Sequence, residues 1–194
     1  MNTALLLIDI QNDYFPGGKH ELVAPLTAAQ HAYMLLQCFR ESAGHHVHVQ
    51  HVSREPDATF FIAGDRGTDI HESVAHFEGE PLVYKHHPNS FLETTLHELL
   101  QSWGIQRLVI TGMMTHMCVD ATARAAADLG YGVIVASDAC ATRDLKFGST
   151  LVPADHVQKA FLAALEAYGR VMPTENILVL LAGERDSDRT KLNN

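Results

Sequence analysis

Short apolar runs alternate with amphipathic stretches along most of the chain. Residues 4–8 form a short continuous apolar run, which is typical of a strand that is buried on both faces, and further strands are expected at 107–111 and 132–137. Residues 25–42 instead carry apolar side chains at spacings of three and four, which predicts a helix. Its predicted buried face consists of Leu26, Ala29, Tyr33, Leu36 and Phe39. The other expected elements are strands at 47–52, 81–84 and 177–181 and helices at 94–103, 115–129 and 153–168.

This alternation predicts a three-layer α/β fold. Parallel strands joined by helices need right-handed crossovers, which place helices on both faces of the sheet. We therefore expect a mainly parallel sheet of about six strands in one domain, residues 1–182, followed by a C-terminal tail at 183–194. Ligands of such sheets bind beyond the carboxyl ends of the strands. Residues that directly follow strands are therefore the candidates for function.

Composition and charge exclude several classes of function. The 194 residues are 46% hydrophobic and 19% charged, which is ordinary for a globular protein. A formal net charge of -9 without any basic run argues against a nucleic-acid partner. No apolar stretch approaches the roughly 20 residues that span a bilayer, and the N-terminus lacks the basic region of a signal peptide. Three widely spaced cysteines do not suggest disulfides, so a cytoplasmic location is expected.

Three side chains at the expected sheet edge have the chemistry for covalent catalysis. Asp9 ends the first strand, Lys85 ends the third, and Cys118 follows the fourth near the start of a helix. Thr115 is a suitable N-cap residue, and both a helix N-terminus and a nearby ammonium favour the thiolate form of cysteine. The carboxylate could take the thiol proton, while unpaired amides of the first helical turn could hold an oxyanion.

Each of these residues also has a purely structural interpretation. Asp9 could cap a helix or pair with a cation, and Lys85 could be a solvated strand end. Free cysteines are usually small buried hydrophobes, which suits Cys38 and Cys140. This interpretation suits Cys118 less well, because a corner between strand and helix presents side chains to ligands.

At these residues the chain resembles the isochorismatase-like cysteine hydrolases, a superfamily that includes nicotinamidases and N-carbamoylsarcosine amidase. The resemblance rests on LLLIDIQNDYFPGG, GEPLVYKHHPNSFLETTL, LVITGMMTHMCVDATARAAADLGYGV and SDACAT, and it covers nearly the whole chain. It implies a Rossmann-like fold, usually oligomeric, with a catalytic triad at Asp9, Lys85 and Cys118. It also implies an oxyanion hole made by the backbone N–H groups of Met114 and Cys118, and a cis peptide bond just before Met114.

The activity implied by the resemblance is hydrolysis of a C–N bond in a small amide or ureide. Cys118 would form a thioester, Asp9 would act as general acid and base, and Lys85 would give electrostatic support. Isochorismatases of the same superfamily cleave a vinyl ether without needing the cysteine, and this activity is one alternative. A ligand-binding or thiol-sensing protein without catalysis is the other.

Further predictions concern the partners of this site. The side chains expected to contact a small-molecule substrate are Gln11, Phe15, Phe60, His86 and His116. Nicotinamidases hold a metal through an aspartate and histidines after the second strand, but HVHVQHVSREPDATFF lacks that pattern. Histidines that alternate along a strand are also poorly placed to chelate one ion. We therefore predict no metal and no cofactor, and the resemblance alone suggests a homo-oligomer.

Overall fold

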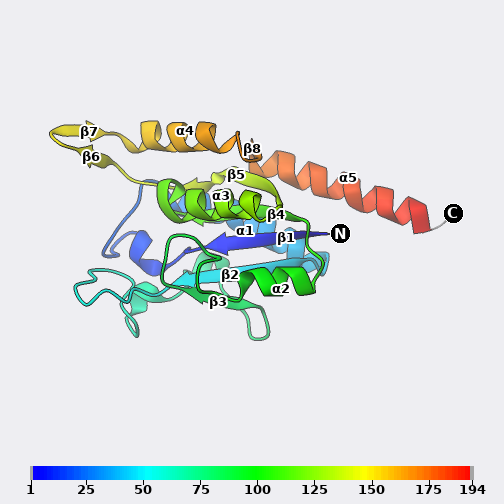
Figure 1. Cartoon of the computed structure of the whole chain (residues 1–194), viewed down its shortest axis with the longest axis horizontal. Helices are drawn as coiled ribbons and strands as arrows, with labels where there is room; N and C mark the ends of the chain where they lie inside the picture. The colour runs from blue at the N-terminus through cyan, green and yellow to red at the C-terminus, as the bar shows by residue number, and fades with distance from the viewer. Residues whose placement is uncertain (1, 193–194) are drawn as a thin grey trace.

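A sheet of six parallel strands forms the centre of the molecule (Figure 1). The computed structural model describes residues 2–192, with side chains described as far as residue 185. The strands are β1 (Thr3–Ile8), β2 (His45–His51), β3 (Leu82–Lys85), β4 (Arg107–Met113), β5 (Gly132–Ala141) and β8 (Arg170–Met172). They lie in the order β3-β2-β1-β4-β5-β8, and each neighbouring pair is parallel. The predicted α/β fold is therefore confirmed.

Helices cover both faces of this sheet. They are α1 (Pro25–Glu41), α2 (Leu96–Ser102), α3 (Asp120–Asp128), α4 (Ala154–Leu165) and α5 (Thr174–Leu192). Strand β1 supplies both apolar cores, because its successive side chains point to opposite faces. Leu5 and Leu7 pack with residues of α1 and α5, whereas Leu6 and Ile8 pack with residues of α2, α3 and α4.

The C-terminal segment is helical where the sequence predicted a strand. Residues 177–181 lie inside α5, and the sixth strand is instead the short β8. Ile177 and Leu181 are one helical turn apart, so both reach the same core beside α1. A short apolar run such as ILVLL fits a buried strand and a buried helix equally well, which explains the error. Helix α5 also continues past the predicted domain end at residue 182.

Helix α1 buries part of the predicted face. Ala29, Leu36 and Phe39 are buried as predicted, whereas Leu26 and Tyr33 are 48% and 45% exposed. The buried face also includes small residues that the prediction left out, Ala28 and Ala32, since small residues let α1 lie close against the sheet.

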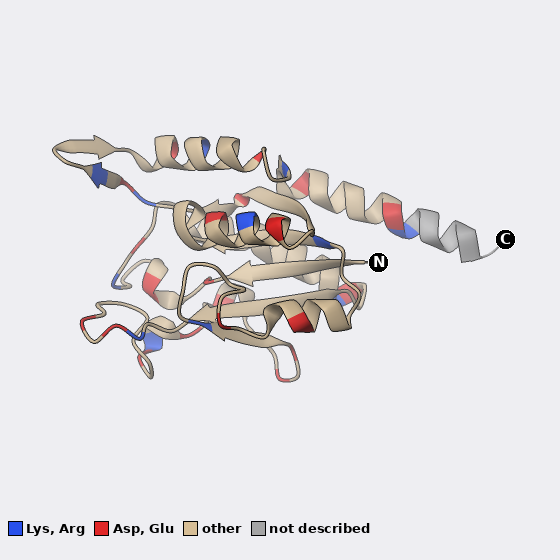
Figure 2. Ribbon diagram, in the orientation of Figure 1, with Lys and Arg blue, Asp and Glu red and all other residues tan. Residues whose placement is uncertain are grey.

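A β-hairpin projects from the end of β5, and the sequence analysis did not predict it (Figure 1). It consists of β6 (Leu145–Phe147) and β7 (Thr150–Val152), which pair antiparallel and apart from the main sheet. Acidic and basic residues are interspersed along the ribbon (Figure 2). Within residues 2–192, none of the helices combines the length and apolar character needed to cross a bilayer.

One glycine brings the ends of β1 and β4 together. Gly112 has a φ of +130°, and the register between β4 and β5 shifts between Ile110 and Gly112. A Cβ atom at residue 112 would lie 2.0 Å from the carbonyl oxygen of Ile8. Only glycine permits this approach. It brings the end of β4 against the end of β1, next to Asp9.

Candidate active site

Asp9 is the first residue after β1, and its side chain is fully buried. Its φ of +52° lies in the left-handed region, which aspartate tolerates better than most residues. Its backbone N–H donates to the carbonyl oxygen of Val49 at 2.9 Å, so the turn is tied to β2. Oδ1 is buried and accepts no hydrogen bond from any described residue. A buried carboxylate needs a cation, and Lys85 supplies it.

The ammonium of Lys85 lies at the centre of the site. Its Nζ is 2.7 Å from Oδ2 of Asp9 and 3.3 Å from Sγ of Cys118. It also donates to Nδ1 of His51 at 2.9 Å and to the carbonyl oxygen of His87 at 3.1 Å. Burial alone would lower the pKa of Lys85, but the neighbouring Asp9 and Cys118 raise it above its usual value. Asp9 and Cys118 therefore favour the charged form of Lys85.

Cys118 lies in η4 (Thr115–Val119), a π-helical turn that leads into α3, and it is 5% exposed. Burial raises the pKa of Cys118, the charge of Asp9 raises it further, and Lys85 opposes both effects. The raised pKa favours the neutral thiol over the thiolate that the sequence analysis expected. The free-energy cost of burying a thiolate away from water exceeds the stabilisation that the Lys85 ammonium provides, because the Asp9 carboxylate offsets part of the ammonium's charge.

The turn before Cys118 also differs from the predicted helix start. Met114 holds the N-cap position, while the Thr115 hydroxyl donates to Oε1 of Gln158 at 2.7 Å instead of capping the helix. The peptide bond between Met113 and Met114 is cis, as the family resemblance suggested. A single turn of π-helix within a helix is frequently found at functional sites.

His51 joins this site although the sequence analysis did not select it. It is the last residue of β2 and pairs in register with Lys85 on β3. Burial lowers the pKa of His51 to about 4, so the ring is neutral and its Nδ1 accepts the Lys85 hydrogen bond. Asp9 and Lys85 were selected because they lie at the carboxyl ends of strands. The same criterion could have identified His51, because β2 lies between β1 and β3 and ends at the same edge of the sheet.

The same cluster has ligand atoms at a spacing suited to a metal ion. Asp9, His51 and Cys118 each offer one atom within 4.8 Å of the other two. However, the Lys85 ammonium contacts all three, so a positive charge already lies among the ligands. These residues do not fit a metal ion while Lys85 stays in place, because two cations would repel each other at such short range.

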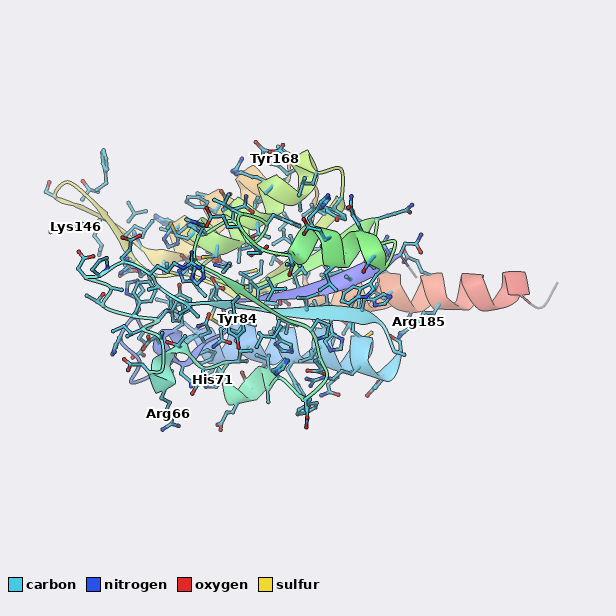
Figure 3. The ribbon with its side chains drawn as sticks, turned by 60° about the horizontal axis from the view of Figure 1, so that its bottom comes forward. Arg66, His71, Tyr84, Lys146, Tyr168 and Arg185 are labelled. Carbon is cyan, nitrogen blue, oxygen red and sulfur yellow. The ribbon has the colours of Figure 1, made fainter. Side chains whose placement is uncertain are left out.

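Gln11 and Phe15 lie on the loop after Asp9, among the expected substrate contacts. Gln11 is fully buried, and its side-chain amide bonds only to backbone groups, including the N–H and carbonyl of His51. It therefore holds the end of β2 in place. Phe15 stacks on His71 with 3.5 Å between ring centroids, beside a cavity of about 460 Å³. Arg66 and His71, labelled in Figure 3, both line this cavity.

The remaining expected contact residues are spread around the edge of the sheet. Phe60 stacks on His20 with 4.4 Å between centroids. One ring nitrogen of His86, Nδ1, bonds to the carbonyl oxygen of Val52 at 2.7 Å. His116, two residues before the cysteine, lies with its Nδ1 2.6 Å from the hydroxyl of Thr142. The structure thus brings Asp9, Lys85 and Cys118 into contact, whereas these contact candidates hold several separate positions.

Sequence and fold match one protein family. The family model of the isochorismatase domain matches residues 3–176. The chain belongs to the isochorismatase family. It is accordingly a hydrolase, and the family acts on small-molecule substrates.

Individual relatives show how far this similarity extends. The uncharacterised isochorismatase family protein YddQ of Bacillus subtilis is 50% identical over 92% of this chain and 99% of its own length. Streptothricin hydrolase of Streptomyces noursei is 31% identical over 88% of this chain and 62% of its own length. A crystal structure assigned to an isochorismatase hydrolase from Oleispira antarctica is 49% identical, with a TM-score of 0.87 over 91% of this chain and 96% of that one.

Proposed function

We propose that this hydrolase cleaves a C–N bond of a small amide or ureide through a thioester on Cys118. The observation that carries the proposal is the position of Lys85, whose Nζ lies 2.7 Å from Asp9 Oδ2 and 3.3 Å from the Cys118 sulfur. A carboxylate oxygen of Asp9 and the sulfur of Cys118 also lie within 4.8 Å of each other, which supports proton exchange between them. The name of the streptothricin hydrolase relative is consistent with hydrolytic cleavage of an organic substrate.

In the first half of the reaction, Asp9 acts as general base and then as general acid. It takes the thiol proton as the sulfur attacks the carbonyl carbon, which is why a neutral resting thiol is compatible with nucleophilic catalysis. The backbone N–H groups of Met114 and Cys118 bind the resulting oxyanion. Asp9 then gives the proton to the leaving nitrogen, the C–N bond breaks, and an amine departs from the thioester.

In the second half, a water molecule replaces the amine. Asp9 takes a proton from this water, and the oxygen attacks the thioester carbon. The S–C bond then breaks, the acid product departs, and the proton returns from Asp9 to the Cys118 sulfur. Lys85 remains charged throughout, because its pKa is raised by the two groups that it contacts. Its role is to stabilise the negative charge that moves between them.

Vinyl-ether hydrolysis remains the second candidate, since Asp9 and Lys85 could act without the cysteine. The two activities differ in whether Cys118 is needed. We expect Cys118→Ala to lower turnover of a panel of small primary amides and ureas at least about a thousandfold, because the nucleophile is gone. Mass spectrometry of the quenched wild-type reaction should show an acyl adduct on Cys118.

A second cysteine provides the matched control. Cys38 is half-buried in α1, so Cys38→Ala should retain turnover. Full turnover by Cys118→Ala would refute the amidase proposal and favour the vinyl-ether reaction. A wild-type protein that turns over none of these compounds but shows reversible oxidation of Cys118 would instead favour ligand binding or thiol sensing.

The setting in which the enzyme acts is also a proposal. We infer a single catalytic domain that acts in the cytoplasm as a homo-oligomer, without nucleic acid or membrane as a partner. The net charge of -9 supports the exclusion of nucleic acid. Sedimentation of the purified protein would test the oligomeric state.

A further inference from the structure

Gln158 of α4 joins the nucleophile turn, η4, to the end of β5. Its Oε1 accepts a hydrogen bond from the Thr115 hydroxyl at 2.7 Å. Its Nε2 donates to the carbonyl oxygens of Cys140 at 3.0 Å and Ser137 at 3.3 Å. Both ends of one side-chain amide are therefore engaged, and they connect segments that are far apart in the sequence.

Thr115 is the first residue of the nucleophile turn, and its side chain is fully buried. A buried hydroxyl needs an acceptor, and Gln158 supplies one that is closer than the carbonyl oxygen of Ala141 at 3.1 Å. Cys118 follows in the same turn. The position of the turn therefore decides how far the sulfur lies from the ammonium of Lys85, which is 3.3 Å away.

The other end of the Gln158 amide contacts an irregular part of β5. Residues 136–139 lie opposite Thr111 alone, because the register between β4 and β5 shifts there. Extra residues in one strand disrupt the ladder and leave backbone groups without their usual partners. The carbonyl oxygens of Ser137 and Cys140 lie in or next to this segment, and Gln158 donates to both. The amide thus fixes the nucleophile turn relative to the irregular part of the strand.

A second side chain of α4 contacts the same turn. Phe161 lies three residues after Gln158, on the same face of the helix. Its ring and the ring of His116 have centroids 5.9 Å apart. The start of the helix is held by Asp144, which accepts a hydrogen bond from the backbone N–H of Ala154 at 2.7 Å. Helix α4 (Figure 1) is therefore fixed at its start and supports the turn through two side chains.

We propose that Gln158 is a positioning residue, which holds the nucleophile turn through Thr115 so that the sulfur stays beside Lys85. This inference rests on the proposed function and adds to it a residue that acts through another residue. The proposed oxyanion donors, the N–H groups of Met114 and Cys118, lie at the start of this turn and within it. A displaced turn would therefore move the nucleophile and the oxyanion hole together, and a shift of about 1 Å can lower turnover about a hundredfold.

Steady-state kinetics of Gln158→Leu test this role. The variant loses all three hydrogen bonds, and Gln158 borders a cavity of about 330 Å³, so the new side chain has room to adjust. With the small amides and ureas that the wild type turns over, kcat should fall at least about tenfold while KM changes little. Gln101→Leu makes the same replacement at an exposed position of α2 and should have wild-type kinetics. Wild-type kcat in Gln158→Leu would overturn the proposal.

Gln158→Glu adds a rescue that depends on pH. A protonated glutamic acid can donate and accept as glutamine does, whereas a carboxylate only accepts and would face two backbone carbonyl oxygens. The kcat of this variant relative to the wild type should be low at about pH 8 and rise at least about threefold by about pH 5. For Gln158→Leu the same ratio should not depend on pH. A constant ratio for Gln158→Glu would overturn the role of the amide, and this variant also replaces Gln158→Leu if the latter does not fold.

A double-mutant cycle tests whether Gln158 acts through Thr115. Thr115→Val removes the hydroxyl with little change in shape. If the two side chains act as one unit, adding Thr115→Val to Gln158→Leu should lower kcat by less than about a further twofold. A further loss as large as the one that Thr115→Val causes in the wild type would show independent action and overturn the proposal.

Hydrogen exchange separates this inference from the function on which it rests. Amide exchange in a peptide that covers residues 114–119 should be at least about tenfold faster in Gln158→Leu, while peptides of β1 and β2 keep wild-type rates. An equal increase in all peptides would indicate a general loss of stability and overturn the positioning role. Turnover that survives in Cys118→Ala would overturn the amidase mechanism, while the exchange data would still report on Gln158. Turnover that requires Cys118 but not Gln158 would overturn the role of Gln158 alone.

Discussion

At the level of single residues, the buried ammonium of Lys85 contacts Asp9, His51 and Cys118 at once. The His51 ring is neutral, because its pKa is lowered to about 4. Its position is fixed by Gln11, which bonds to the backbone N–H and carbonyl of His51. His51 therefore positions Lys85 through one hydrogen bond without adding a charge to the site.

This role predicts a selective loss of turnover when His51 is replaced. His51→Leu removes the acceptor, so Lys85 can move away from the sulfur, and kcat should fall about tenfold to a hundredfold while KM changes little. His51→Gln, which keeps an acceptor, should recover part of the loss. His156→Gln changes an exposed histidine of α4 and should have wild-type kinetics. A His51→Leu enzyme with unchanged kcat would contradict the positioning role.

At the level of the elements, the ends of β1 and β4 depend on close contact at Gly112. Gly112 has a φ of +130°, and a Cβ atom at this position would lie 2.0 Å from the Ile8 carbonyl oxygen. The position therefore has no room for a side chain. Asp9 follows Ile8 directly, and the cis bond before Met114 follows Gly112 by one residue. The same contact therefore places the acid and the start of the nucleophile turn.

Gly112→Ala should consequently be severely destabilising. We expect a loss of about 3 kcal/mol in the free energy of unfolding, because strain at positive φ adds to a clash with backbone that cannot rotate away. Gly130→Ala is the matched control, since Gly130 also has a positive φ, +88°, but faces open space. Its expected cost is about 1 kcal/mol. Urea unfolding measures both, and equal costs would refute the close-contact argument.

At the level of the whole molecule, a second polar cluster joins α1, β2 and the loop before β3. Glu80 receives two hydrogen bonds of 2.7 Å from Arg40 and lies 3.0 Å from Nε2 of His46. His48 is buried beside this cluster, with Nε2 3.5 Å from the nearest Glu80 oxygen, and His76 packs against its ring. Burial lowers the pKa of His48 to about 3, although the charge of Glu80 opposes the shift.

This cluster predicts the pH dependence of stability. An unfolded histidine titrates near 6.5, so between about pH 6.5 and 3 the unfolded chain binds a proton at His48 that the folded chain does not. Stability should therefore fall on acidification through this window, by up to about 1.4 kcal/mol per pH unit for this one group. Glu80, whose pKa is lowered to about 2, adds a loss below about pH 4.5.

Urea unfolding at several pH values tests this dependence. His48→Gln removes the titrating ring, so its stability should change less than that of the wild type between about pH 6.5 and 4.5. His97→Gln, in which the ring of α2 next to Tyr131 is replaced, is the control and should keep the wild-type slope. If His48→Gln also kept that slope, the buried neutral histidine would not be the cause.

The sequence by itself determined the fold class, the order of most elements and the positions of Asp9, Lys85 and Cys118 at one sheet edge. The spacing of apolar residues is a local property of the chain, so it is enough to predict the helices and strands. Parallel strands place their carboxyl ends at one edge of the sheet, so the order of the strands is enough to predict where the three residues lie. Only the tertiary structure decided that residues 177–181 are helical, that Leu26 and Tyr33 of α1 are exposed, and that His51 joins the site. These features depend on burial and on contacts between distant segments, as does the raised pKa of the Cys118 thiol. Desolvation and neighbouring charges act through space, and no local pattern of residues specifies them.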